Sequence, residues 1–243
     1  MEKNTFKSQE EKNQVFHPNL QSQVYTDLEF SPARNITNRT GFKKTVGKFP
    51  SLKMRRTVMW ESQIERDFLY LLEFDADVLS FYEQPVEILY AHKTKTGRYF
   101  PDLYVERRSC KELIEIKPSS KLNDPKNKIK FLAGEEYCRR RGWIFRVVTD
   151  DNIREGNLLK NVKLLNRYAA VDVSTEFEQH TQSLVETNDG EIGLAELIVR
   201  SREKFGKAAI SNIYSLLYHQ LLYADLKKTL SDQTTIKLSK GVE

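Results

Sequence analysis

Apolar residues recur at about 3.6-residue intervals between residues 60 and 73, and this spacing predicts a helix. The apolar arc of this helix consists of Trp60, Ile64, Phe68, Leu71 and Leu72. Glu61 and Glu65 fall inside the arc, whereas the other polar residues, Asp67 and Glu73 among them, fall outside it. A carboxylate on the core-facing side of a helix needs compensation. An arginine partner and an acidic catalytic site both satisfy that need.

The segment after this helix predicts strands. They are expected at residues 86–90, 98–106 and 111–117. A hairpin loop at 91–97 separates the first two, and a polar turn at 107–110 joins the second to the third. Pro118 ends the third strand, because proline has no backbone donor.

A second helix is expected after the third strand. Asp124 is its predicted N-cap and Pro125 its first residue, and it runs to about Arg141 and ends at Gly142. Residues 143–148 then predict a fourth strand. The order helix–strand–strand–strand–helix–strand indicates an α/β fold, with a mixed sheet flanked by helices.

The C-terminal third has a different pattern, and a helix at 158–169 leads into it. Further helices are expected at 175–187, 192–200 and 207–219, and short apolar segments at 221–226 and 234–238 flank a polar tip. Two helices followed by a two-stranded wing predict a small winged-helix-like domain. Such domains often bind DNA, but this region is net acidic, so a protein-binding role is equally open.

Charge is distributed unevenly along the 243 residues, which carry a net charge of +5. Residues 34–56 contain no acidic residue, and their basic residues are Arg34, Arg39, Lys43, Lys44, Lys48, Lys53, Arg55 and Arg56. Residues 171–243 contain eight basic and eleven acidic residues, a net charge of −3. The basic segment favours contact with a phosphate backbone; a solvated loop is the alternative.

No apolar run approaches the length needed to span a bilayer, and the N-terminus lacks the apolar stretch of a signal peptide. The two cysteines, Cys110 and Cys138, show neither metal-ligand spacing nor a disulfide framework. We therefore expect a cytoplasmic protein without membrane partners.

The candidate chemistry lies in Pro101-Asp102 and Glu115-Ile116-Lys117. Side chains alternate between the faces of a strand, so Glu115 and Lys117 share one face. A hairpin brings Asp102 beside Glu115, and two carboxylates at one point suit Mg²⁺. A Glu-x-Lys pair on a strand is often a solvated face. Here the surrounding apolar residues indicate that Glu115 is buried, which favours a metal-dependent nuclease.

Four segments together resemble the TnsA family, the endonuclease subunits of heteromeric transposases. They are Glu-Ser-x-Ile-Glu-Arg-Asp-Phe (61–68), Glu-Gln-Pro-Val (83–86), Arg-Tyr-x-Pro-Asp (98–102) and Glu-Ile-Lys-Pro (115–118). The resemblance covers residues 40–150, and more loosely the C-terminal region. It implies a restriction-endonuclease-like domain of the PD-(D/E)xK type. We expect an N-terminal arm at 1–56, this nuclease domain at 57–170 and the winged-helix-like domain at 171–243.

The resemblance also implies the site residues. Glu65, Asp102, Glu115 and Lys117 would be catalytic, and Asp102, Glu115 and the carbonyl of Ile116 would hold Mg²⁺, with Mn²⁺ as a substitute. Gln84 and Glu61 are further active-site candidates. Family members nick the 5′ strand at transposon ends during cut-and-paste transposition, beside the DDE-type recombinase TnsB and the AAA+ ATPase TnsC.

Two other functions stay open at this point. A stand-alone restriction or repair nuclease would share the same core, and a non-catalytic regulator would bind DNA through the winged helix. The joint presence of Asp102, Glu115 and Lys117 favours an enzyme over the regulator. The acidic C-terminal region favours a transposase subunit over a stand-alone enzyme, because it suits protein docking better than reading of a DNA site.

Overall fold

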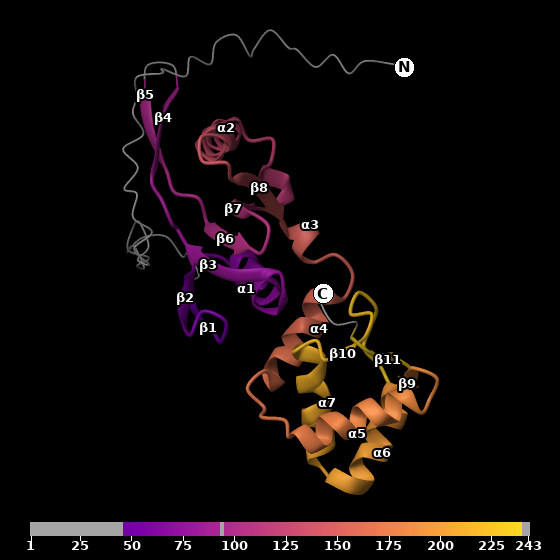
Figure 1. The fold of residues 1–243 in the computed structure, drawn as a ribbon. Coiled ribbons are helices and arrows are strands. Elements are labelled where there is room, and N and C mark those ends of the chain that lie inside the picture. Colours follow the sequence, from indigo (N-terminus) through magenta and orange to yellow (C-terminus); the bar gives the residue numbers. More distant parts are fainter. Residues whose placement is uncertain (1–45, 93–94, 240–243) are drawn as a thin grey trace, which may run out of the picture. The chain divides into compact units, whose positions relative to one another are not determined.

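The computed structural model describes residues 46–92 and 95–239 (Figure 1). Contacts divide these residues into two compact units. The first comprises residues 46–66 and 77–150, and the second comprises 67–76 and 151–239. The predicted division into three domains stays a prediction. In the structure the chain passes from the first unit to the second after residue 150, whereas the predicted boundary is at residue 170.

A four-stranded mixed sheet forms the centre of the first unit. Its strands are β3 (Val78–Glu83), β6 (Leu103–Arg107), β7 (Lys111–Lys117) and β8 (Ile144–Thr149). The order is β3-β6-β7-β8, in which β3, β6 and β7 are antiparallel neighbours and β8 runs parallel to β7. The mixed α/β architecture predicted from the sequence is confirmed, and it is consistent with a restriction-endonuclease-like fold.

Two hairpins accompany this sheet. One pairs β1 (Gly47–Ser51) with β2 (Arg56–Trp60), and the other pairs β4 (Ile88–His92) with β5 (Lys95–Tyr99). The first hairpin includes the end of the basic segment 34–56. The ring of Trp60 packs against Gly47 across the hairpin, and a side chain at position 47 would collide with this ring.

The predicted strand over 98–106 is wrong, because two strands occupy this segment. β5 ends at Tyr99 and β6 begins at Leu103, so Phe100, Pro101 and Asp102 separate a hairpin strand from a sheet strand. Pro101 lacks the amide hydrogen that a continuous ladder would need. The break places Asp102 directly before β6, at the end of an inner strand of the sheet.

The first helix starts later than predicted. α1 spans Gln63–Phe74, while Trp60 ends β2 and Glu61 precedes the helix. The expected apolar arc is also partly wrong. Asp67 and Glu73, which the prediction places outside the arc, are buried together with Leu69 and Leu72. Asp67 is buried because it forms ion pairs with Arg154, at 3.1 Å, and with Lys163. These charged partners are distant in the sequence, and helical periodicity does not reveal them.

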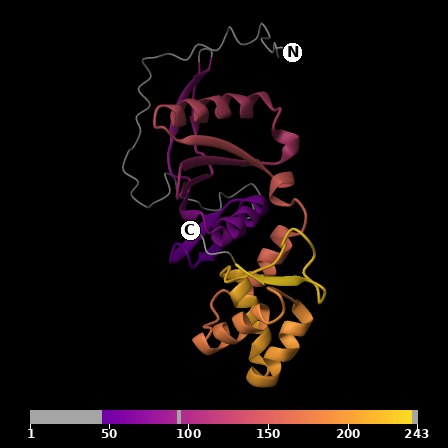
Figure 2. The ribbon, with the colours of Figure 1, turned by 45° about the vertical axis from the view of Figure 1, so that its right-hand side comes forward.

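Helix α2 (Pro125–Arg139) follows the sequence closely. Asp124 accepts a hydrogen bond from the amide of Lys126 at 2.9 Å, which confirms the predicted N-cap. The chain leaves the helix at Gly142, whose φ of +66° favours glycine. α2 covers the sheet beside β7 and β8 and also contacts β4 (Figure 2). The core between these elements contains Val86, Ile88, Tyr99, Leu113, Ala133, Tyr137 and Cys138.

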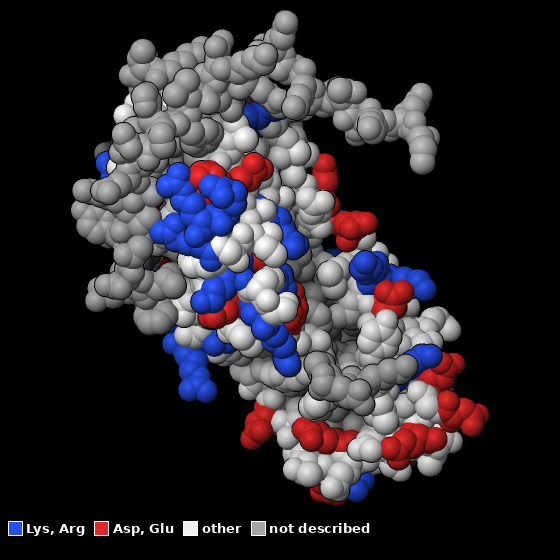
Figure 3. Space-filling model, turned by 45° about the horizontal axis from the view of Figure 1, so that its top comes forward, with Lys and Arg blue, Asp and Glu red and all other residues white. Residues whose placement is uncertain are grey.

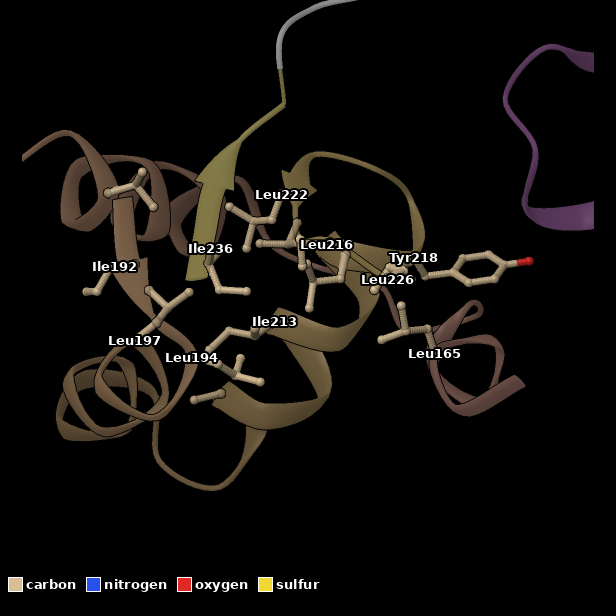
Figure 4. Close-up of a cluster of buried hydrophobic side chains, with 14 of the residues drawn as sticks. Leu165, Ile192, Leu194, Leu197, Ile213, Leu216, Tyr218, Leu222, Leu226 and Ile236 are labelled. Carbon is tan, nitrogen blue, oxygen red and sulfur yellow. The ribbon is translucent and has the colours of Figure 1, made fainter. Parts of the chain in front are cut away.

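The second unit is mainly helical. After α3 (Asp150–Ile153), its elements are α4 (Leu158–Leu165), α5 (Thr175–Glu186), β9 (Glu191–Gly193), α6 (Leu194–Phe205), α7 (Ala208–Tyr218), β10 (Leu222–Tyr223) and β11 (Thr235–Leu238). The three strands form an antiparallel sheet in the order β10-β11-β9. Figure 4 shows the core of this unit, where Leu197 and Ile213 of the helices meet Ile236 of the sheet.

The helix predicted at 192–200 is displaced. Residues 191–193 pair with β11 as a short strand, so α6 begins at Leu194 and continues to Phe205. From α5 onward the element order is helix–strand–helix–helix–strand–strand. The winged-helix assignment itself stays a prediction. Among the described residues, no helix is both long enough and apolar enough to cross a membrane.

Replacing Gly134 with valine should destabilise the first unit by about 1–3 kcal/mol, because overpacking a filled core forces side chains and backbone to shift. A Cβ at Gly134 would lie 2.3 Å from the Phe145 ring, so either this ring or α2 would have to shift. Urea denaturation measures the change. Glu135→Val is the matched control, since this neighbouring position is exposed. Equal losses in both variants would contradict close packing at Gly134.

Candidate active site

A cavity of about 490 Å³ opens in the first unit between the start of α1, the β5–β6 connection, β7 and α2. It is lined by Glu61, Ser62, Ile64, Glu65, Arg98, Tyr99, Phe100, Asp102, Glu115, Ile116, Lys117, Pro118 and Lys130. The cavity therefore brings together the acids and the lysine that the sequence singled out, from segments more than 50 residues apart. Gln84 is not among its lining residues.

Strand register places Asp102 beside Glu115. Leu103 pairs with Ile114 in the β6–β7 ladder, so the next residue of each strand is Asp102 and Glu115. Asp102 Oδ2 also accepts a hydrogen bond from the amide of Ile116 at 2.7 Å, which fixes the carboxylate against β7. Glu115 is only 2% exposed, in agreement with the apolar pattern around it.

The ammonium of Lys117 lies among three oxygen atoms. Its Nζ is 2.5 Å from Glu115 Oε1, 3.0 Å from the carbonyl oxygen of Ile116 and 3.5 Å from Asp102 Oδ2. Residues 115 and 117 share a strand face, so one lysine reaches both carboxylates. This point of the cavity therefore already accommodates a positive charge.

Sequence reasoning missed Tyr99. Its hydroxyl donates a hydrogen bond to Glu115 Oε2 at 2.8 Å, and its ring is part of the core beneath α2. Together with Lys117, it satisfies both oxygens of the buried carboxylate. Tyr99 stands in the Arg-Tyr-x-Pro-Asp segment, but a tyrosine at the end of a strand is typical of any core. Only the return of β5 toward β7 reveals the contact.

Glu65 has a structural role at the start of α1. The Ser62 hydroxyl accepts a hydrogen bond from the Glu65 amide at 3.2 Å and donates one to Glu65 Oε1 at 2.9 Å. Glu65 Oε2 accepts a further bond from the amide of Glu61 at 2.7 Å. This arrangement is a variant of the capping box. It holds the Glu65 carboxylate at the cavity wall, whereas Glu61 lies before the helix.

Gln84 acts on the site through its backbone. It is buried, has a φ of +43°, and its amide donates a hydrogen bond to the carbonyl of Asp102 at 2.9 Å. A positive φ is unfavourable for a residue with a side chain, so the surrounding strands must enforce it. The contact ties the end of β3 to the segment that carries Asp102.

Burial and mutual repulsion perturb the acids of the cavity. Burial raises the pKa of Glu115 to about 7, and the Asp102 carboxylate adds to this effect. The pKa of Glu65 is also raised to about 7, first by burial and then by Asp102. Burial would lower the pKa of Lys117, but Asp102 and Glu115 outweigh it and raise that pKa. The site therefore holds a stable cation next to acids that titrate near neutrality.

The donor set fits a divalent cation of the Mg²⁺ type. Within residues 46–92 and 95–239, no group of three or more His, Cys, Asp or Glu side chains is arranged to bind a metal. Mg²⁺ does not require one, since it often takes one or two carboxylates and keeps several waters. Asp102, Glu115 and the Ile116 carbonyl supply hard oxygen ligands around the Lys117 ammonium. A metal ion would have to displace that ammonium.

The predicted DNA-binding residues are only partly described. Arg34, Arg39, Lys43 and Lys44 lie outside the described residues. Lys48 and Arg55 are exposed.

The last two predicted DNA contacts have partners within the first unit. Lys53 donates to the carbonyl of Val78 at 2.8 Å, and Arg56 forms a two-pronged ion pair with Glu83 at 2.9 and 2.6 Å. Basic side chains nevertheless gather on one face of this unit (Figure 3).

In the absence of divalent ions, raising the pH from about 5 to about 7.5 should lower the free energy of unfolding. The acids at positions 65 and 115 have a folded-state pKa of about 7, whereas a glutamate in an unfolded chain titrates near about 4.3. Between these values the folded state binds more protons, so stability decreases as the pH rises. Urea denaturation across this range measures the effect. Glu65→Gln should flatten the dependence, and the exposed Glu203→Gln should retain it; identical curves for wild type and Glu65→Gln would refute the assignment.

A comparison with protein families finds a match to part of the first unit. Residues 75–150 match the family model described as TnsA-like endonuclease N terminal. The matched segment includes Asp102, Glu115 and Lys117, whereas Glu61 and Glu65 precede it. No curated protein matches the chain. The resemblance to the TnsA family is confirmed by this match: residues 75–150 form a TnsA-like endonuclease N-terminal domain.

Proposed function

We propose that this chain is a Mg²⁺-dependent DNA endonuclease that nicks the 5′ strand at transposon ends during cut-and-paste transposition. The TnsA-like domain indicates a nuclease related to transposition. The observation that supports the catalytic assignment is the cluster of Asp102, Glu115 and the Ile116 carbonyl around one ammonium group. Such a cluster gives oxygen ligands and a cation at one point of an open cavity.

Asp102, Glu115 and the Ile116 carbonyl would hold the metal ion, and Mn²⁺ offers the same preference for oxygen ligands. When bound, the ion polarises the scissile phosphate and lowers the pKa of a bound water. Tyr99 keeps Glu115 in position through its hydroxyl. The amide of Ile116 does the same for Asp102, so both carboxylates are oriented before DNA arrives.

Lys117 acts as a charge stabiliser in this proposal. Its pKa is raised by the two carboxylates, so the amine stays protonated at neutral pH. A protonated lysine cannot accept a proton from water, which favours electrostatic stabilisation of the phosphate over general-base catalysis. Hydrolysis would leave a 5′-phosphate and a 3′-hydroxyl.

The TnsA-like domain also implies DNA binding and association with a transposase machinery. We propose TnsB and TnsC as the specific partners, and the second unit as a winged-helix domain that docks on protein. The net acidic charge of residues 171–243 supports this role over DNA binding. A stand-alone nuclease would instead cut DNA in the absence of any partner and without preference for transposon ends.

Asp102→Ala should abolish Mg²⁺-dependent nicking, because it removes a proposed metal ligand. Labelled transposon-end DNA, incubated with the protein and its proposed partners, reports the cut strand on a denaturing gel. Removal of Mg²⁺ by EDTA should have the same effect on wild type.

Asp102→Asn separates ligand loss from misfolding, since the amide oxygen can still accept the Ile116 hydrogen bond. The matched control is Asp151→Ala, a substitution at an exposed position. Nicking at the wild-type rate by Asp102→Ala would refute the metal site.

Glu65→Gln should lose most nicking, whereas Glu61→Gln should mainly lose a little stability. Both side chains line the cavity, but Glu61 lies before the helix, whereas the Glu65 carboxylate is held at the cavity wall and its pKa is raised to about 7, first by burial and then by Asp102. A glutamine retains most of the capping geometry, so the loss of charge is what this variant tests. Single-turnover nicking at saturating Mg²⁺ measures both effects. An inactive Glu61→Gln with an active Glu65→Gln would reverse the assignment.

A further inference from the structure

The start of α2 carries positive charge beside the cavity. Residues 118–134 contain four lysines and a single acidic residue, Asp124. The Asp124 carboxylate is engaged as the helix N-cap. The local charge of this segment is therefore available to an outside partner.

Two of these lysines lie on the cavity side of the helix. Lys130 lines the cavity, and its Nζ is 5.9 Å from the centre of the Tyr99 ring. Lys126 precedes it by four residues, which places both on the same helix face about 6 Å apart along the axis. Lys128 lies about 200° around the helix from Lys126, on the opposite side.

Lys126 and Lys130, like Lys128, carry charge that no described acid neutralises, but Lys128 lies on the opposite side of the helix from the cavity. Neither Lys126 nor Lys130 forms an ion pair with any described residue. At the other end of α2, Arg139 and Arg140 are both paired with Glu136, at 2.7 and 2.8 Å. Because no acidic side chain neutralises these two lysines, their positive charge can interact with a ligand that approaches the cavity.

We infer that Lys126 and Lys130 form a phosphate-binding strip that guides the backbone of duplex DNA into the cavity. The ligand chemistry follows from the site: ammonium groups on flexible stems neutralise phosphates without reading bases. Lys130 reaches the cavity itself, and Lys126 extends the contact one helical turn away from it. The inference rests on the proposed nuclease function, since it assumes that DNA enters this cavity.

The test is the salt dependence of DNA binding by the full chain. Fluorescence anisotropy with a short labelled duplex, in EDTA so that nicking does not intervene, gives the affinity at several salt concentrations. Each lost phosphate contact should reduce the slope of log K against log salt by about 0.9. Lys126→Gln/Lys130→Gln should therefore flatten the slope by about 1.8 relative to wild type, whereas Lys128→Gln should leave it unchanged.

Thermal melting of each variant verifies that it is folded, and Lys126→Glu provides a second variant at this exposed position. Equal slopes for wild type and the double variant would overturn the inference, as would an equal loss in Lys128→Gln. Binding that depends on the strip, without any nicking in Mg²⁺ when the proposed partners are added, would leave the strip intact and refute the nuclease function. Nicking by the wild type, together with an unchanged salt slope in the double variant, would refute the strip and retain the nuclease function.

Discussion

The structure of the first unit depends on a buried carboxylate. Glu115 lies in the middle of a sheet, on a strand whose neighbouring residues are almost all buried. An ionised carboxylate in such a place is costly unless it is paired and hydrogen-bonded. Lys117 supplies the charge and Tyr99 supplies the hydrogen bond, so each oxygen of Glu115 has its own partner. The hairpin β4–β5 must return to the sheet for Tyr99 to make that contact.

This compensation has a consequence for metal binding. Asp102 and Glu115 repel each other, and the Lys117 ammonium stabilises the pair in the absence of a metal. A divalent ion that takes the same oxygens competes with this ammonium, so part of its binding free energy is used to displace an existing cation. The displaced lysine stays tethered two residues from Glu115, which keeps a positive charge near any phosphate that follows.

The sequence was sufficient where local rules determine the structure. The buried character of Glu115, the N-cap at Asp124 and the juxtaposition of Asp102 with Glu115 all follow from alternation, capping and hairpin pairing. The predictions failed where contacts between distant segments of the chain determine whether a side chain is buried. Asp67 is buried because Arg154 and Lys163 approach it from nearly a hundred residues away. Likewise, the contact of Tyr99 with Glu115 requires two strands that are not neighbours in any ladder.

Helix α1 shows how a local pattern can be correct in composition and wrong in register. The same residues that suggested a helix from Trp60 include a strand residue, a connecting acid and the capping serine at position 62. Ser62 and Glu65 complete each other's hydrogen bonds only if the helix starts at Gln63. Glu65 then stands at the first turn, where its carboxylate both caps the helix and faces Asp102.

Counting basic residues along the sequence also overestimated the charge that the N-terminal segment offers to DNA. Arg56 is held by the buried Glu83, and Lys53 by a backbone carbonyl; an ion pair that closes inside the unit cancels a charge that the sequence alone would count as free. On α2, Glu136 follows the lysines and pairs with Arg139 and Arg140 about one turn later. The free positive charge of the unit is therefore set by which cations lack an acid within reach, and that depends on the fold rather than on composition.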